Sequence, residues 1–214
     1  MCTSISMLAD ISRLSTQFRI DRLLSYSSNR YEISPRQSLS AIVSNRKSER
    51  LLDEFRWGLM PFWAREAVCG DKESIFRNMA FDRLIRKQRC VIPCSGFYIS
   101  QTAGKQTQWF RFNMRSGTFG IAGLYDVWRS PSGEELRTCM MLMTEANSLI
   151  SPHHHSMPAI LEEADIDAWL QPPVKEAAPL KSLLQPMDEL RMVRSSLASE
   201  QEKLELQTDM GALA

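Results

Sequence analysis

The stretch CVIPCSGFY, residues 90–98, decides the fold because it begins the longest series of strand-like segments in the chain. Its apolar residues are typical of a buried strand. Three more strands are predicted after it, at residues 109–114, 118–127 and 136–144. Turns rich in Gly, Ser and Pro, such as residues 130–133, separate these strands. The economical arrangement of such neighbours is a meander or a strongly curved sheet.

Shorter elements are predicted on both sides of this series. Apolar residues from Met7 to Phe18 recur at helical spacing and predict a helix over residues 6–18. Further helices are predicted at residues 80–89, 165–170 and 180–184, strands at residues 39–43 and 55–59, and a loop at residues 67–74. The chain therefore has mixed α and β content.

The composition is that of one globular domain. The 214 residues are 43% hydrophobic and 24% charged, which excludes a disordered or collagen-like chain. The formal net charge of +1 gives no overall field, so DNA binding would need a local basic groove. No apolar run is long enough to span a bilayer and no secretory pattern is present, so we expect a cytoplasmic protein. Weak patterning predicts a loose tail over residues 198–214, after a domain over residues 1–197.

The five cysteines are an odd number, which argues against a disulfide framework. Cys90 and Cys94 could form half of a metal site, but no second pair at zinc spacing exists, and the residues between them are typical of a buried strand. We expect buried structural thiols here and no metal.

The chain's three histidines are consecutive, at His153, His154 and His155. Adjacent side chains do not converge on either a strand or a helix, which argues against one shared metal ion. One of the three could act as a general acid or base, because histidine titrates near neutral pH.

Two segments allow a structural and a nucleic-acid interpretation. The aromatic run WGLMPFW, residues 57–63, is more typical of core packing, but it could also stack on unpaired bases. The predicted helix 80–89 carries Arg83 and Arg86, which form either a solvated face or contacts to phosphate groups.

Cys2 directly follows Met1. Removal of Met1 would leave a chain that begins with both an α-amine and a thiol, and both are partly deprotonated near neutral pH. Together they can trap an aldehyde, first as an imine and then as a five-membered thiazolidine ring. Taken alone, Cys2 is as well explained as a tolerated small residue at a frayed terminus.

Several segments, taken in order, resemble the SRAP family, the SOS response-associated peptidases that process abasic sites. They are residues 1–2, 30–37, 57–63, 89–98, 122–128, 144–147 and 154–161. The resemblance implies one compact α+β domain with a curved, mostly antiparallel sheet system, flanked by short helices. It also implies covalent crosslinking of a mature N-terminal cysteine to abasic sites in single-stranded DNA, self-removal of Met1, and neither a metal nor an organic cofactor.

Carried over position by position, the resemblance assigns crosslinking to Cys2 and proton transfer to His154. It assigns base contacts to Trp57, Gly58 and Pro61. The loop written Asn-Ala-Arg-x-Glu-Thr in the family resembles a shortened segment here, which leaves Arg77 and Asn78 as candidates for its DNA contact.

The chain departs from the family pattern at four other places. The basic residue of the family's Met-Cys-Gly-Arg start is missing, Ile99 replaces a catalytic carboxylate, and Ser156 replaces an arginine. Glu32 stands where the family has Asn, and we interpret it as a candidate replacement for the carboxylate missing at Ile99.

Three functions remain open from the sequence. The first is an abasic-site crosslinking enzyme acting through Cys2. The second is a catalytically degenerate member that only binds single-stranded DNA or another partner. The third is a thiol peptidase acting on other proteins. We expect a monomer in each case.

Overall fold

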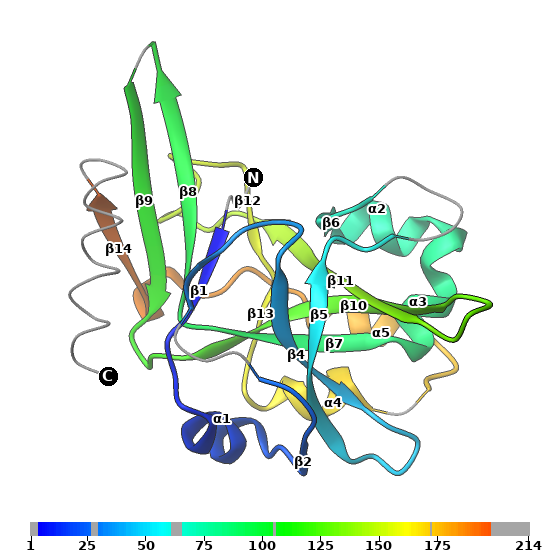
Figure 1. The fold of residues 1–214 in the computed structure, drawn as a ribbon. Coiled ribbons are helices and arrows are strands. Elements are labelled where there is room, and N and C mark those ends of the chain that lie inside the picture. The colour runs from blue at the N-terminus through cyan, green and yellow to red at the C-terminus, as the bar shows by residue number, and fades with distance from the viewer. Residues whose placement is uncertain (1–3, 27–29, 61–65, 105, 172, 198–214) are drawn as a thin grey trace.

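The computed structural model describes residues 4–26, 30–60, 66–104, 106–171 and 173–197, which form two sheets and several short helices (Figure 1). Cys2, Pro61 and the predicted tail lie outside the described residues.

Five strands of the larger sheet close into a small barrel. β11 pairs with β10, β10 with β7, β7 with β4, and β4 with β5, and β5 then pairs in parallel with β11. These strands are β4 (Ser38–Ser44), β5 (Arg50–Trp57), β7 (Arg89–Cys94), β10 (Phe119–Arg129) and β11 (Glu135–Glu145). Short strands extend the barrel at its edges: β2 (Arg22–Leu23), β6 (Cys69–Asp71), β12 (Ser156–Pro158) and β13 (Ile160–Leu161).

The second sheet is antiparallel and has the order β14-β9-β8-β1-β3. Its strands are β1 (Ser4–Met7), β3 (Arg30–Ile33), β8 (Gly96–Ala103), β9 (Gln106–Met114) and β14 (Met192–Leu197). Ser95 alone separates β7 from β8 and carries the chain from the barrel into this sheet. At Gly96 a Cβ atom would come within 2.9 Å of Arg111 Nε, so glycine allows the guanidinium to lie against the backbone.

The helices are short and lie around the sheets (Figure 1). Asp10 caps the first of them by accepting a hydrogen bond from Arg13 N. They are α1 (Ile11–Phe18), α2 (Lys72–Arg77), α3 (Asp82–Lys87), α4 (Asp165–Leu170) and α5 (Ala178–Lys181), with 3₁₀ turns η1 (Met79–Phe81) and η2 (Glu189–Arg191). Among the described residues, no helix has the length and apolar character needed to cross a membrane.

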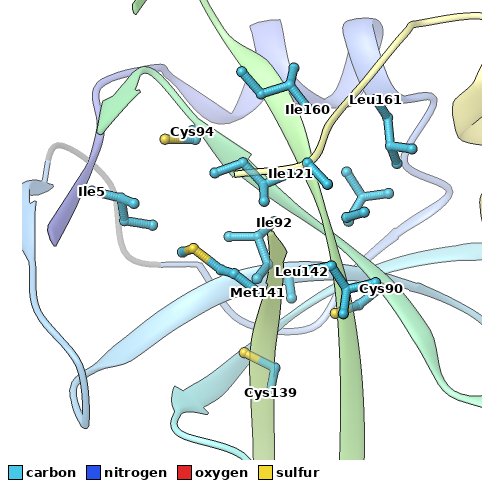
Figure 2. Close-up of a cluster of buried hydrophobic side chains, with 14 of the residues drawn as sticks. Ile5, Cys90, Ile92, Cys94, Ile121, Cys139, Met141, Leu142, Ile160 and Leu161 are labelled. Carbon is cyan, nitrogen blue, oxygen red and sulfur yellow. The ribbon is translucent and has the colours of Figure 1, made fainter. Parts of the chain in front are cut away.

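One hydrophobic core joins the barrel to the second sheet. Figure 2 shows Ile5 of β1 beside residues of the barrel strands, including Ile92, Ile121 and Met141, and all four side chains are fully buried. Cys90, Cys94 and Cys139 belong to the same core and are free thiols, as expected for buried structural cysteines.

The predicted fold class is confirmed, and so is the strand series after residue 89, which breaks only at Ser95. The helix predicted over residues 6–18 is wrong at its start, because Ser6 and Met7 belong to β1 and the helix begins at Ile11. Backbone pairing with β3 and β8 outweighs the helical spacing of the apolar residues there. The predicted loop 67–74 contains β6 and the start of α2.

Candidate functional site

Strand β1 brings the start of the chain onto the second sheet. Ser4 pairs with Tyr98 of β8, and Ile5 pairs with Ile33 of β3. Cys2 precedes Ser4 by two residues, so the covalent chain keeps their Cα atoms within about 7.6 Å. The position of Ser4 therefore limits where the thiol of Cys2 can act.

The histidine turn docks on the same strand. Gln101, three residues after Tyr98 on β8, donates a hydrogen bond to Pro152 O at 3.0 Å. The side chain of His153 packs against Phe110, with ring centroids 4.0 Å apart, and its Nδ1 lies 3.0 Å from Gln101 Oε1. His153 thus attaches the turn to β8 and β9, while its neighbour His154 is left for other contacts.

His154 is half-buried and is held by Ser156. The Nδ1 atom lies 3.0 Å from Ser156 O and 3.1 Å from Ser156 N, and the Ser156 hydroxyl is 3.2 Å away. Burial lowers the pKa of His154; the contact with the Ser156 backbone opposes this, and His155 adds to the lowering. The imidazole is therefore neutral at pH 7 and able to accept a proton. The serine that replaces the family's arginine orients this ring.

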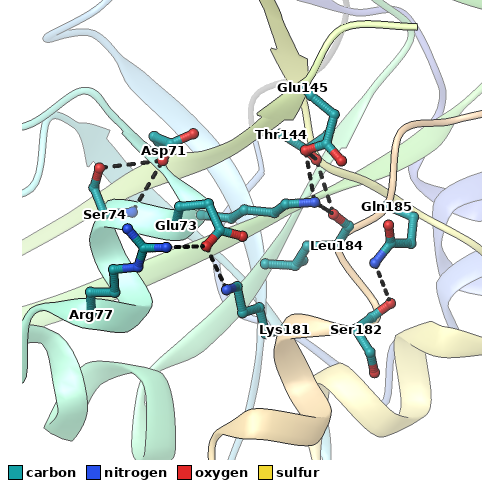
Figure 3. A network of polar contacts seen from close by, with 11 residues as sticks. Asp71, Glu73, Ser74, Arg77, Thr144, Glu145, Lys181, Ser182, Leu184 and Gln185 are labelled. Carbon is teal, nitrogen blue, oxygen red and sulfur yellow. Dashed lines mark hydrogen bonds and ion pairs between the residues drawn. The ribbon is translucent and has the colours of Figure 1, made fainter.

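Two polar anchors hold the end of β11 that leads into the turn. Asn147 donates to Met187 O at 2.7 Å and accepts from Ile150 N at 3.1 Å. The buried ammonium of Lys72 lies 2.8 Å from Glu145 Oε2 and donates to Leu184 O at 3.0 Å, as Figure 3 shows for the network around Glu145. Lys72 starts α2, so this network also attaches that helix to β11.

Strand β6 is a part of the candidate site that the sequence interpretation missed. Cys69 pairs with Met141 and Asp71 with Met143, while β12 pairs with the same end of β11 at Met143. β6 and the strand after the histidine turn therefore share β11. Burial raises the pKa of the Cys69 thiol. A single thiol in a segment without clear periodicity gives little signal in the sequence.

Glu32 and Ile99 lie on opposite faces of the second sheet. Phe97 pairs with Ile5, and Ile5 pairs with Ile33, so alternation places Ile99 on their face and Glu32 on the other. Ile99 is 1% exposed. Burial is the main cause that raises the pKa of Tyr98, and the charge of Glu32 contributes. Glu32 thus shares a face with Tyr98 and Ser4, and Ile99 lies on the other face.

Trp57 and Gly58 support a loop rather than offering an open surface. Trp57 is 1% exposed, and its indole N–H donates to Val68 O at 2.7 Å. Gly58 has φ of +142°, and a Cβ atom there would lie 2.3 Å from Glu66 Oε1. Arg36 and Arg56 hold that carboxylate at 2.9 and 2.7 Å, and their hydrogen bonds lower its pKa. Core packing, the interpretation that the residues of this run favour in the sequence, describes Trp57.

The basic candidates lie on α2, α3 and the turn between them. Arg77 is exposed and lies 3.6 Å from Glu73, and Asn78 caps η1 by accepting from Ala80 N. Arg86 pairs with Asp82 at 2.8 Å. Arg77, Asn78 and Arg86 line one cavity of about 360 Å³, whereas Arg83 pairs with Asp126 at 3.0 Å and lines another. The structure thus separates Arg83 from the other candidates.

No group of three or more His, Cys, Asp or Glu side chains suited to a metal ion occurs among the described residues. Strand β8 instead contacts two segments: β1, which follows Cys2 in the sequence, and the turn that carries the neutral imidazole of His154. A neutral imidazole that is held in one orientation can accept a proton.

Comparison with known proteins gives matches over nearly the whole chain. A family model described as "SOS response associated peptidase (SRAP)" matches residues 1–200. The chain is 31% identical over 198 residues to "Abasic site processing protein YoqW" of Bacillus subtilis (strain 168), with 88% of each chain covered. "Abasic site processing protein HMCES" of Gallus gallus is 28% identical over 186 residues, which cover 67% of this chain and 55% of that protein.

Solved structures share the fold. A crystal structure of a Bacteroides thetaiotaomicron protein superposes with a TM-score of 0.80 at 26% identity and covers 92% of both chains. One of a Bordetella bronchiseptica protein has a TM-score of 0.76 at 23% identity, covering 91% of this chain and 99% of that one, which shows the fold alone.

Proposed function

The chain belongs to the SOS response associated peptidase (SRAP) family, and from this premise we propose that it processes abasic sites in DNA. The names of its relatives support this function. The structural observation that carries the proposal is that β1 and the histidine turn both contact β8, at Tyr98 and at Gln101 respectively.

The proposed chemistry begins with hydrolysis of the Met1–Cys2 peptide bond, which consumes one water and frees the α-amine of Cys2. The amine then condenses with the ring-opened aldehyde of the abasic site to form an imine and releases one water. The thiol adds across the imine: sulfur bonds to carbon, and the thiol proton passes to nitrogen, which closes a thiazolidine. The covalent link shields the abasic site in single-stranded DNA.

His154 is the proposed carrier of protons in these steps. Its neutral ring can accept the thiol proton and return it to nitrogen, and the contacts with Ser156 keep the ring in one orientation. Glu32 is a second proposed carboxylate contributor, acting from the face that carries Ser4 and Tyr98. A test of that role is Glu32→Gln, which should slow crosslinking; an unchanged rate would remove Glu32 from the mechanism.

The DNA strand is proposed to pass the loop supported by Trp57 and Gly58, with Pro61 in the part outside the described residues. Arg77 and Asn78, with Arg86 in the same cavity, are the proposed phosphate contacts there, and Arg83, which lines a different cavity, is a further one. We further propose a monomer in the cytoplasm, where the four described free thiols would stay reduced.

One observation favours a second function, in which the protein binds single-stranded DNA or another partner without catalysis. Ile99 fills with an apolar, buried side chain the position where the family has a carboxylate. Losing a positioned acid or base commonly costs about 10²- to 10⁴-fold in rate.

The experiment that separates these functions uses a single-stranded oligonucleotide with one abasic site. Denaturing gels would follow crosslinking by the wild type, Cys2→Ala and Cys139→Ala, after intact mass has established that Met1 is absent. Cys139→Ala is the matched control, because it removes a buried thiol that is not assigned to the chemistry. We expect a heat-stable band in the wild type and Cys139→Ala alone. No band in any of them would favour the non-catalytic function, and a band in Cys2→Ala would contradict the chemistry.

A further inference from the structure

A second cationic cavity lies at the far end of the barrel from the histidine turn. Its volume is about 480 Å³, and it is lined by the β4–β5 turn, the end of α3 and the segment after α4. β5 runs from Arg50 at this end to Trp57 near β6, and a rise of about 3.3 Å per residue separates these ends by about 23 Å. The cavity is therefore distinct from the site around β1 and His154.

The lining of this cavity has one sign of charge. None of the described residues that line the cavity is acidic. Four cationic side chains contribute to it, namely Arg46, Arg83, Lys87 and Arg89. Arg83 is partly neutralised by Asp126, which lies 3.0 Å away. Arg46 and Lys87 are exposed and form no ion pair with any described residue. Two positive charges therefore remain uncompensated at one cavity.

Arg89 adds a fixed positive charge to the wall of the cavity. It is 5% exposed, and its guanidinium donates to the carbonyl oxygens of Ile85 and Trp169, both at 2.6 Å, and to that of Gln171. These partners are neutral, and burial lowers the pKa of Arg89 to about 10, so the group stays charged at neutral pH. A buried cation whose hydrogen-bond partners are all neutral produces a positive potential that attracts an anion.

The cavity also holds a buried hydrogen-bond acceptor. Gln88 Oε1 has no donor among the described residues, although Gln88 Nε2 donates to Asp126 at 3.0 Å. Next to it the turn is held in shape, because Asn45 Oδ1 accepts from Lys47 N at 2.8 Å and from Glu49 N at 3.0 Å.

We propose that this cavity binds a phosphate group, held by Arg46 and Lys87 with Arg83 and Arg89 behind them. The phosphate belongs either to a small phosphorylated molecule, such as a nucleotide, or to a DNA strand. The volume is within the range of small-molecule sites. The inference does not rest on the crosslinking chemistry, because it needs neither Cys2 nor an abasic site.

The first test is calorimetric titration of the full chain with inorganic pyrophosphate. Arg46→Gln/Lys87→Gln should weaken binding about tenfold or more, because charge-assisted hydrogen bonds are lost. Lys47→Gln/Lys175→Gln is the matched control, since it removes two exposed positive charges that do not line the cavity. It should bind as the wild type does. Thermal melts would establish that all variants fold.

The second test identifies the source of the phosphate. Anisotropy with an undamaged single-stranded oligonucleotide is measured against salt concentration. A DNA phosphate in the cavity predicts a salt slope smaller by about 1.4 in Arg46→Gln/Lys87→Gln alone, whereas an unchanged slope with lost pyrophosphate binding identifies a small phosphorylated ligand. If pyrophosphate does not bind the wild type and the two double variants have equal slopes, the proposal is overturned. The undamaged strand keeps this result independent of crosslinking by Cys2.

Discussion

The pair formed by Lys72 and Glu145 predicts an asymmetric response to mutation. The side chain of Lys72 is 7% exposed, whereas that of Glu145 is 59% exposed, although their charged atoms lie 2.8 Å apart. Glu145→Ala leaves the buried ammonium group of Lys72 donating to Leu184 O, without a negative charge beside it. Lys72→Met leaves a carboxylate that water can hydrate, and Leu184 O still accepts from the Thr144 hydroxyl at 3.0 Å.

The magnitudes follow from these exposures. Breaking a fully buried pair costs about 3–5 kcal/mol, and we discount this to about 2 kcal/mol for Glu145→Ala because water reaches the Glu145 side of the contact. Lys72→Met should cost about 1 kcal/mol, since the stem of the side chain stays packed. The double variant should resemble Lys72→Met, because the buried charge that makes Glu145→Ala costly is then absent.

Urea denaturation of the wild type, both single variants and the double variant measures these free energies of unfolding. The hydrogen bond from Lys72 lowers the pKa of Glu145. A carboxyl group whose pKa is lower in the folded than in the unfolded protein stabilises the fold at any pH above its unfolded-state pKa. This stabilisation is lost as the pH falls through the folded-state pKa. The difference in free energy of unfolding between the wild type and Glu145→Ala should therefore shrink in acid. The reasoning is refuted if Lys72→Met is the more damaging single change at pH 7.

Three other results are expected. Trp57→Ala should lower the free energy of unfolding by about 3–5 kcal/mol in denaturant titrations. Trp128→Ala is the control at a position that is 51% exposed, and it should lower this free energy by less than about 1 kcal/mol. Similar losses in the two variants would contradict a packing role for Trp57. Gly58→Ala should lower the free energy of unfolding by about 1–3 kcal/mol in thermal melts, because of the positive φ of Gly58 and its close contact with Glu66; unchanged stability would contradict strain at this position. Relative to His154→Gln, wild-type crosslinking should lose its rate advantage as the pH falls through the lowered pKa of His154; an advantage lost at a pH centred above about 6.5 would exclude neutral His154 as the base.

Local patterns were sufficient wherever neighbours in sequence are also neighbours in space. Residues 109–144 alternate and turn as a meander does, and the helix predicted at residues 165–170 coincides with α4. The roles of Cys2 and His154 came from ordered motifs and stay predictions. Cys69 was missed because one thiol in a segment without clear periodicity gives little local signal.

By itself, the sequence determined the fold class, the order of most strands and the residue types available for chemistry, because periodicity and motif order are local properties. The tertiary structure alone decided that Ser6 and Met7 form a strand, that Trp57 is buried, and that Glu32 and Ile99 lie on opposite faces. It also brought Arg46 and Lys87 to one cavity. These outcomes depend on which distant segments pair and in which register, and a one-residue change of register reverses every face.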